Sequence, residues 1–323
     1  MKFVYVLISD GKDFYPEQLL ISILSLKKHN PLAEVVVITD RDTKESLEEK
    51  KSLILETDVE FVEVVIPNRF NKKCRSRYLK TTLPEYLKDS FLYIDSDTVI
   101  NGDLTEVEKF EYDLGAVYDR NENGEFNRYM ELHLNKSGIE DIDKLVFFNG
   151  GVIFARNSDN TRNFFKDWHR LWLAYHEKLS LEIDQISLLK TNQLNGNIIQ
   201  PLPGYYNCQV AFQPAIKYLS KAKIIHYIAD YKEMKIFPLE NEEVLLNIRK
   251  NGITSIVGEI INNPVEIFLQ DKFIINSREK KLYDSNNVVL AKELTRYYPW
   301  TNKPAHWVLT IWAFLRLIKS KFR

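Results

Sequence analysis

The chain of 323 residues contains little cysteine and no large excess of charge of either sign. Its two cysteines, Cys74 and Cys208, are too few for a disulfide framework, and their spacing is not that of a metal-binding pair. We therefore expect a reducing compartment. The formal net charge of −1 gives no electrostatic reason to expect a nucleic acid as partner.

The chain also lacks long apolar runs. No stretch approaches the roughly 18 consecutive apolar residues of a membrane-spanning helix. The apolar run at residues 3–8 is too short for the core of a secretory signal peptide and indicates a first β-strand. These absences predict a cytoplasmic protein.

A third absence concerns glycine-rich nucleotide-binding loops. The loop at residues 8–15 contains neither the G-x-G-x-x-G fingerprint nor a P-loop, and it lacks the glycine-rich loop of sugar nucleotidyltransferases. A metal ion and basic side chains would then have to neutralise a bound phosphate. In this loop, Ser9 and Asp10 are candidate contacts to the base or ribose of a nucleotide, and Tyr15 is a candidate for stacking on the base. A turn followed by a helix-packing aromatic residue would give the same pattern.

The chain contains alternating apolar strands and amphipathic helices. This order predicts an α/β fold with a mostly parallel central sheet, covered by helices on both faces. The expected strands are residues 3–8, 35–39, 59–66, 91–94, 114–118 and 147–155, and the expected helices are residues 17–29, 44–55, 76–87 and 161–175.

The sequence changes character near residue 240. We expect a catalytic domain at residues 1–240 and an appended, β-containing extension at 241–300, which is a candidate for the side that binds an acceptor substrate. Two apolar stretches in the extension, 265–275 and 281–290, predict a small β-hairpin. The aromatic and basic residues at 301–323 are typical of a helix lying on an anionic membrane, although a last helix docked on the domain would fit the same composition.

The most informative segment is Asp95-Ser96-Asp97, which follows the apolar strand expected at residues 91–94. In an extended backbone Asp95 and Asp97 point to the same side. They would lie at the carboxyl edge of the sheet, where open α/β sheets bind ligands. Two carboxylates at this spacing could hold a hard divalent cation together with a phosphate-bearing substrate. The alternative is an Asp-rich turn without a metal.

Further segments follow in an order that resembles glycosyltransferase family 8, which includes glycogenin and bacterial galactosyl- and glucosyltransferases of lipopolysaccharide synthesis. Each segment alone is a weak signal, whereas their order over residues 1–235 is typical of the family. They are Arg77-Tyr78-Leu79-Lys80, Asp95-Ser96-Asp97, Phe147-Phe148-Asn149-Gly150-Gly151-Val152, Asp184-Gln185, and Ile224-Ile225-His226-Tyr227 with Lys232 beyond. The resemblance implies a GT-A-type, Rossmann-like nucleotide-sugar-binding domain.

The resemblance also implies roles for individual residues. Asp95, Asp97 and His226 would bind Mn²⁺ or Mg²⁺, and an imidazole ligand favours Mn²⁺. Lys80 and Lys232 would pair with the diphosphate of the donor, beside Ser96. Asp119, Asn149, Gly150 and Asp184 would contact the donor sugar, and Gln185 would lie near its anomeric carbon. We therefore expect Gln185, Asp184 and Lys232 to be the catalytic residues.

The chain departs from the family pattern after His226. Ala229 occupies a position where the family usually has glycine, and the family's K-P-W ending is absent after Lys232. Alanine restricts the backbone more than glycine does. The loop that carries Lys232 is therefore the part of the expected site that differs most from the family.

Together these features predict a metal-dependent, retaining glycosyltransferase that moves galactose or glucose from a UDP-sugar to a glycan acceptor. The acceptor would be lipid-linked or of the lipopolysaccharide or capsule type, presented at the inner membrane face. Three alternatives stay open: an inverting transferase with Asp184 or Glu182 as base, a self-glucosylating protein of the glycogenin type, and a non-catalytic glycan-binding protein.

Overall fold

The computed structural model describes residues 1–122, 134, 137, 139, 145–228, 239 and 241–268. The chain divides into two compact units, Met1–Ile274 and Ile275–Arg323, and every residue described here belongs to the first.

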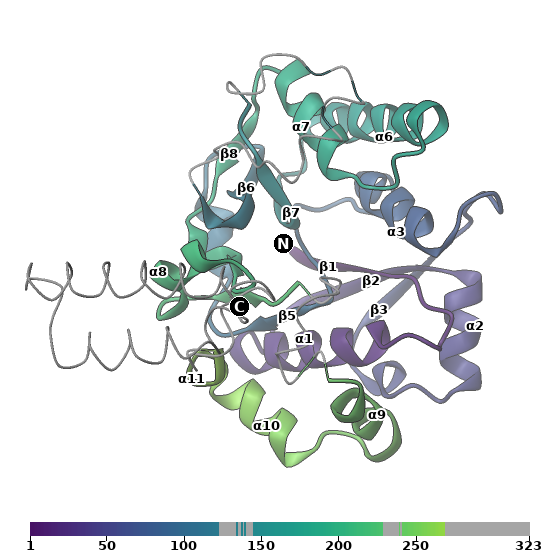
Figure 1. The fold of residues 1–323 in the computed structure, drawn as a ribbon, viewed down its shortest axis with the longest axis vertical. Helices are drawn as coiled ribbons and strands as arrows, with labels where there is room; N and C mark the ends of the chain where they lie inside the picture. Colours follow the sequence, from purple (N-terminus) through teal and green to yellow (C-terminus); the bar gives the residue numbers. More distant parts are fainter. Residues whose placement is uncertain are drawn as a thin grey trace, which may run out of the picture. The chain divides into compact units, whose positions relative to one another are not determined.

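A seven-stranded sheet forms the centre of this unit, in the order β3-β2-β1-β4-β7-β6-β8 (Figure 1). All neighbouring pairs are parallel except those of β7, which runs antiparallel to both β4 and β6. The expected α/β class with a mostly parallel sheet is therefore confirmed. The strands are β1 (Lys2–Leu7), β2 (Glu34–Asp40), β3 (Glu60–Val64), β4 (Phe91–Ile94), β6 (Leu114–Tyr118), β7 (Phe148–Ala155) and β8 (Ile199–Pro201).

Successive residues of the buried strands point to opposite faces of the sheet, and each face packs against its own hydrophobic core. In β1, Val4 and Val6 belong to the core that contains Trp168 of α6. Tyr5 and Leu7 belong to the opposite core. Figure 1 shows α3, α6 and α7 on one side of the sheet and α1, α9 and α10 on the other. A strand buried on both faces explains the continuous apolar runs of β1, β2 and β4.

Five of the described helices, namely α2, α3, α6, α9 and α10, begin at a side chain that accepts a hydrogen bond from the first turn. Asp40 accepts from the Thr43 N–H, and Asn71 accepts from the Cys74 N–H. Such caps satisfy donors that the helix itself leaves open. The helices up to residue 219 are α1 (Tyr15–His29), α2 (Arg41–Glu49), α3 (Lys72–Thr81), α4 (Leu83–Tyr86), α6 (Asp159–Leu179), α7 (Gln185–Leu194) and α8 (Ile216–Leu219). Short 3₁₀ turns are η1 (Leu53–Glu56), η2 (Thr105–Lys109), η3 (Asp119–Asn121), η6 (Gly204–Tyr206) and η7 (Gln213–Ala215).

Two expected helices are each divided. The expected helix at 44–55 is α2 followed by η1, and the expected helix at 76–87 is the end of α3 followed by α4. The second division lies at Thr82, because Pro84 in the first turn of α4 has no N–H with which to continue the hydrogen bonds of α3.

A small second sheet adjoins the carboxyl end of β4. Its strands are β5 (Thr98–Ile100), β10 (Ile224–His226) and β9 (Cys208–Gln209), in the order β5-β10-β9. β5 and β10 are antiparallel, and Thr98 is paired with His226. This pairing brings the chain at residue 226 next to the segment that carries Asp95 and Asp97.

The part of the chain after residue 240 begins with helices. These are α9 (Glu242–Asn251), α10 (Ser255–Asn262) and α11 (Pro264–Phe268). The strand expected from residue 265 is wrong for residues 265–268, because Pro264 favours the first turn of a helix and Phe268 packs in the core formed with α9 and α10. The rest of the expected hairpin and residues 301–323 lie outside the described residues. Within the described part of the chain, no helix combines the length and apolar character needed to cross a membrane.

Candidate active site

Asp95, Asp97 and His226 come together at the carboxyl end of β4. One possible ligand atom from each residue lies within 4.8 Å of the others, and His226 Nε2 is 3.2 Å from Asp97 Oδ1. The backbone fixes the position of Asp95: its N–H donates to the Gly151 carbonyl at 2.7 Å, and its carbonyl accepts from the Thr98 hydroxyl at 2.9 Å. The clustering expected from the sequence is therefore present.

The buried amide of Asn207 orients the imidazole of His226. His226 Nδ1 lies 3.0 Å from Asn207 Oδ1, which can only accept a hydrogen bond. The proton of a neutral imidazole is therefore on Nδ1, and the Nε2 lone pair faces the two carboxylates. Burial lowers the pKa of His226, but the carboxylates of Asp97 and Asp95 outweigh this effect, so that its pKa is raised.

Gly151 of β7 leaves the space that these three side chains fill. A Cβ atom at this position would overlap His226 Cε1 and would lie 2.9 Å from both Asp95 Oδ2 and Asn149 Oδ1. Two carboxylates and one imidazole nitrogen, gathered around a residue without a side chain, fit a divalent metal ion.

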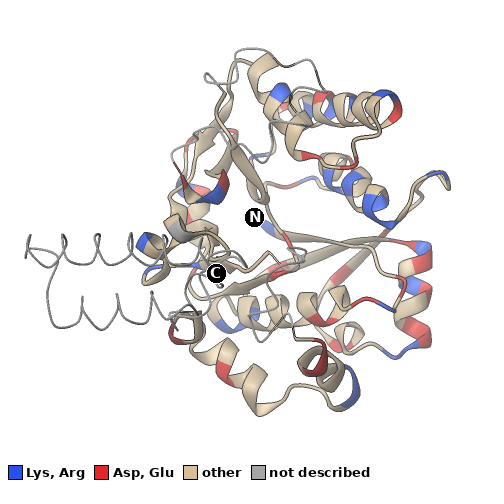
Figure 2. Cartoon of the chain, viewed as in Figure 1, with Lys and Arg blue, Asp and Glu red and all other residues tan. Residues whose placement is uncertain are grey.

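The helix α3 supplies positive charge beside the cluster. Figure 2 shows Lys and Arg positions in blue along the ribbon of α3, which contains no acidic residue. A cavity of about 170 Å³ lies between this helix and the carboxyl ends of β1 and β4. Its lining includes Tyr15, Lys72, Lys73, Arg77, Asp95, Ser96 and Asp97.

The loop after β1 forms another part of this edge. Ser9 and Asp10 line an adjoining cavity of about 360 Å³, and Tyr15 lines the first cavity. Lys72 lines both cavities. Its ammonium group lies 2.7 Å from Asp13, 3.6 Å from Asp10 and 5.6 Å from the centre of the Tyr15 ring. The hydrogen bond from the Lys12 N–H is the main cause that holds the pKa of Asp10 at about 2.

Lys80 is buried between two carboxylates. Its side chain is 3% exposed, and Nζ lies 3.6 Å from Asp95 Oδ1 and 3.2 Å from Asp184 Oδ2. The hydroxyl of Tyr93 donates to Asp95 Oδ1, and burial together with the Asp95 charge raises the Tyr93 pKa well above its ordinary value. Asp95 is thus held by a cation and a protonated phenol. A Cβ at Gly150 would lie only 3.2 Å from Lys80 Nζ.

Asp184 precedes α7 and faces two cations. The Trp168 indole N–H lies 3.3 Å from the Asp184 carbonyl and fixes the backbone there. The carboxylate lies 3.2 Å from Lys80 Nζ and 3.2 Å from Arg77 Nε. Burial alone would raise the pKa of Asp184, but Lys80 and Arg77 outweigh it and hold this pKa at about 2. The carboxylate is therefore ionised and a weak base.

A chain of amide hydrogen bonds extends from His226 to Asp119. Asn207 Nδ2 donates to Asn149 Oδ1 at 2.9 Å, and Asn149 Nδ2 donates to Asp119 Oδ1 at 3.1 Å. Asn149 Oδ1 also accepts from the Gly151 N–H at 2.9 Å. The side chain of Gln185, at the start of α7, donates to the Phe148 carbonyl on β7.

The structure thus gathers most of the residues singled out in the sequence at one edge of the sheet. Lys232 and Ala229 lie outside the described residues. Sequence reasoning gave no role to Arg77, although it lies in one of the family segments, and it missed Tyr93 and Asn207 as parts of the site. Arg77 is three residues before Lys80 on the same face of α3, and Tyr93 in β4 is two residues before Asp95, which directly follows that strand, so periodicity signalled both. No sequence signal marked Asn207.

The model of the family described as "Glycosyl transferase family 8" matches residues 7–233. No curated protein shows a significant match to the chain.

Several solved structures resemble the chain at low identity. The glycosyltransferase GlyE from Streptococcus pneumoniae TIGR4 is 21% identical with a TM-score of 0.48, over 82% of this chain and 64% of GlyE, so that the chain spans less than two thirds of that protein. The galactosyltransferase LgtC, solved with donor and acceptor sugar analogues, is 16% identical with a TM-score of 0.48, over 77% of this chain and 95% of LgtC. Mouse xyloside xylosyltransferase 1 is 10% identical with a TM-score of 0.49, over 70% of this chain and 97% of the mouse protein.

The family match extends from β1 past His226 and contains the Asp95-Asp97 strand end, Asn149 and Asp184. With its α/β architecture and this family match, the chain belongs to glycosyl transferase family 8 and is a glycosyltransferase.

Proposed function

We propose that the protein is a metal-dependent, retaining glycosyltransferase that transfers galactose or glucose from a UDP-sugar to a glycan acceptor. The observation that carries this proposal is the cluster of Asp95, Asp97 and His226 beside the basic helix α3. A site with two carboxylates, one imidazole and several neighbouring cations suits a diphosphate held on a metal ion.

Asp95, Asp97 and His226 would hold the metal, and Mn²⁺ is the best candidate because one ligand is an imidazole nitrogen. When bound, the ion would stabilise the negative charge that develops on the departing UDP. The chain's own contribution is to fix the ligands: Tyr93 and Lys80 hold Asp95, and Asn207 holds His226.

The donor cavity supports a nucleotide with its base toward the loop after β1. Tyr15 offers a ring for stacking, and Ser9 and Asp10 offer polar groups for the base or ribose. The diphosphate would then lie toward α3, where Lys73 and Arg77 line the cavity. Lys80 would act from behind Asp95 as a buried positive charge, and Lys232 would supply a further cation.

The sugar would lie among the polar groups on the other side of the metal ligands. Asp119, Asn149 and Asp184 would accept from or donate to its hydroxyls, and Gly150 would leave the sugar room. Asn149 and Asp119 already bond one another, and Lys80 and Arg77 hold Asp184. Such preorganised groups discriminate well between hydroxyl configurations, because a missing partner leaves a buried polar group unpaired.

Two carboxylates were candidates for the base of an inverting reaction. The pKa of Asp184 is about 2, and both of its oxygens face cations. Glu182 accepts from the Asn71 amide at 2.7 Å and lies 3.9 Å from Lys73. The low pKa makes Asp184 a poor candidate for that base. We therefore propose retention, with the departing phosphate taking the acceptor's proton. Gln185 would lie near the anomeric carbon.

The proposal is tested by measuring UDP release from a panel of UDP-sugars, after EDTA treatment and after addition of Mn²⁺ or Mg²⁺. We expect activity to depend on the added metal. Asp95→Asn and Asp97→Asn should each lower kcat by about 100-fold or more, because each removes a ligand charge. Asp89→Asn, which neutralises an exposed aspartate before β4, is the matched control and should retain activity. Full activity of Asp97→Asn would contradict the metal site.

The stereochemistry and the acceptor need separate measurements. We expect the α-configuration of the UDP-sugar to be retained in the first product detected by NMR, and a β-product would show inversion. We expect the acceptor to be a lipid-linked, lipopolysaccharide or capsule glycan, with residues 301–323 binding the membrane surface. Flotation of the full chain with anionic vesicles, but not with neutral ones, would support this location.

A further inference from the structure

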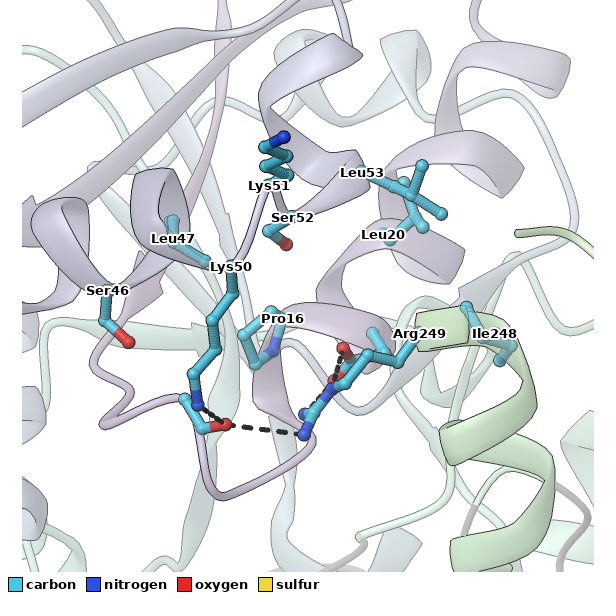
Figure 3. Close-up of a pocket in the computed structure, with 12 residues that line it drawn as sticks. Pro16, Leu20, Ser46, Leu47, Lys50, Lys51, Ser52, Leu53, Ile248 and Arg249 are labelled. Atoms are coloured by element: carbon cyan, nitrogen blue, oxygen red, sulfur yellow. Dashed lines mark hydrogen bonds and ion pairs between the residues drawn. The ribbon is translucent and has the colours of Figure 1, made fainter. Parts of the chain in front are cut away.

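Helix α9 lies beyond the residues that the family model matches, yet it contacts the loop that follows β1. Arg249 in its last turn points into a small cavity of about 30 Å³ between the start of α1, the end of α2 and α9 (Figure 3). This loop, residues 9–15, also borders the proposed donor cavity.

The guanidinium of Arg249 binds one carboxylate and two backbone carbonyls. Nε lies 2.7 Å from Glu17 Oε1, and Nη2 lies 2.8 Å from Glu17 Oε2, which is a bidentate pair with a carboxylate that is 8% exposed. Nη1 donates to the Gly11 carbonyl at 3.4 Å, and Nη2 also donates to the Asp13 carbonyl. The guanidinium carbon lies 4.8 Å from the centre of the Phe14 ring. Only the planar fork of arginine can make this set of contacts.

A second cation reaches the same turn from another element. Lys50, at the end of α2, also donates to the Gly11 carbonyl, and Figure 3 shows Lys50 and Arg249 approaching from opposite sides. Gly11 has a φ of +68°, and a Cβ there would lie 2.5 Å from Ser46 Oγ and would overlap Lys50. The loop is thus held in a turn that glycine adopts most readily.

The restrained backbone of this loop carries Asp13, which contacts side chains of the proposed donor site. Asp13, whose carbonyl is bound by Arg249, accepts from Ser9 Oγ at 2.8 Å and from Lys72 Nζ at 2.7 Å. Lys72 in turn lies over the Tyr15 ring. The shape of the loop therefore determines where Ser9, Lys72 and Tyr15 stand in the cavity.

We propose that Arg249 is a positioning residue for donor binding: from helix α9 it holds the loop at residues 9–15 in the shape that accepts the nucleotide. The proposal rests on the function proposed above. Without Arg249 the loop would sample other conformations. The apparent affinity for nucleotide would then equal the intrinsic affinity multiplied by the fraction of molecules whose loop has the binding conformation.

The test compares amide hydrogen exchange of residues 9–15 with UDP binding by calorimetry in the full chain. Arg249→Ala alone would leave Glu17 buried without a partner and could prevent folding. The informative variant is therefore Arg249→Met combined with Glu17→Gln, which removes both charges and keeps side chains of similar length. Arg249→Lys keeps the charge but loses the fork.

We expect the double variant to exchange faster at residues 9–15, to bind UDP about tenfold more weakly, and to raise the KM for the donor with little change in kcat at saturation. Arg249→Lys should give an intermediate result. Lys250→Ala, which removes an exposed charge from the same turn of α9, is the matched control and should resemble the wild type.

Two results are distinguishable. A folded double variant with wild-type exchange at residues 9–15 and wild-type UDP affinity would overturn the role of Arg249 and leave the proposed function standing. Failure of the wild-type protein to bind UDP with Mn²⁺ would overturn the proposed function, and this inference with it.

Discussion

The buried amide of Asn207 serves two parts of the site at once. Its oxygen accepts from His226 Nδ1, and its nitrogen donates to Asn149 Oδ1, so that one side chain orients a proposed metal ligand and a residue proposed to contact sugar. Partners of this kind behind a metal ligand commonly change metal affinity by 10- to 100-fold when they are removed.

Substitution of Asn207 separates these two effects. Asn207→Asp keeps an oxygen for His226 Nδ1 but loses the donor to Asn149. We expect it to bind Mn²⁺ with nearly wild-type affinity while the KM for the donor rises. Asn207→Leu loses both bonds and should bind Mn²⁺ about 10- to 100-fold more weakly. Titration of Mn²⁺ followed by electron paramagnetic resonance measures the affinities. Equal Mn²⁺ affinity in Asn207→Leu and the wild type would show that the amide does not orient His226.

A second prediction concerns the lack of room for a side chain at Gly151. Gly151→Ala would place a methyl group among His226, Asp95 and Asn149, so we expect Mn²⁺ binding to weaken by at least about tenfold. Gly258→Ala is the control, because a Cβ at this position in α10 meets no atom within 4 Å. That control should stabilise the fold by about 0.5–1 kcal/mol in urea unfolding, since alanine is the better helix former. Unchanged Mn²⁺ binding in Gly151→Ala would contradict the crowding argument.

The two carboxylates of the cluster could be anticipated from the sequence because their spacing in an extended backbone places them on one side. Lys80 could be anticipated only because its segment resembles the family pattern. Asn207 could not, because it is 19 residues from His226 and meets it only through the pairing of β9 with β10. The ion pairs of Asp184 were equally hidden, since α3 and α7 are far apart in the chain.

Among the elements, the long periodic segments were predictable and the short ones were not. Strands β1, β2, β4 and β7 of the main sheet are strongly apolar. Strands β5, β8, β9 and β10 have only two or three residues each, which is too short for a recognisable periodicity in the sequence. The apolar residues after Pro264 have β-type composition, but packing of Phe268 in the core with α9 and α10 outweighs this preference.

The contact between α3 and α6 makes stability depend on pH. His169 of α6 lies 2.8 Å from the Thr81 hydroxyl of α3 through Nδ1, and its ring meets Tyr78 edge-on at 4.9 Å. Burial lowers the pKa of His169 to about 4, whereas an unfolded histidine titrates near 6.5. Between these values the unfolded chain binds more protons than the folded one.

We therefore expect the contribution of His169 to the free energy of unfolding to be complete above pH 6.5 and to fall as the pH drops toward 4. The steepest dependence is about 1.4 kcal/mol per pH unit for one proton, and partial exposure of the ring reduces it. His169→Gln should flatten this part of the curve, measured by urea unfolding between pH 7 and pH 4.5. Lys178→Gln, at an exposed position of α6, should leave the curve unchanged. The same slope in His169→Gln would assign the dependence to other groups.

For the whole molecule, the ligands of the proposed metal come from both sheets. Asp95 and Asp97 follow β4 of the main sheet, and His226 ends β10 of the small sheet. A bound ion would therefore connect side chains from the main sheet and the small sheet directly.

Metal and nucleotide should consequently stabilise the whole fold. At one hundred times the dissociation constant, a ligand that binds only the folded state adds about 2.7 kcal/mol. We expect Mn²⁺ with UDP to raise the midpoint of thermal unfolding, and EDTA to reverse the effect. Asp97→Asn should respond to neither. A full shift in Asp97→Asn would mean that the ion binds elsewhere.

The pairing of β5 with β10 sets Thr98 opposite His226. Since side chains alternate between the faces of a strand, a slip of one residue would turn the imidazole away from both aspartates. Uptake of one metal ion per chain would therefore count correctly folded molecules. In a refolding mixture, the fraction of protein that takes up metal would measure the fraction in which β10 pairs with β5 in the native register.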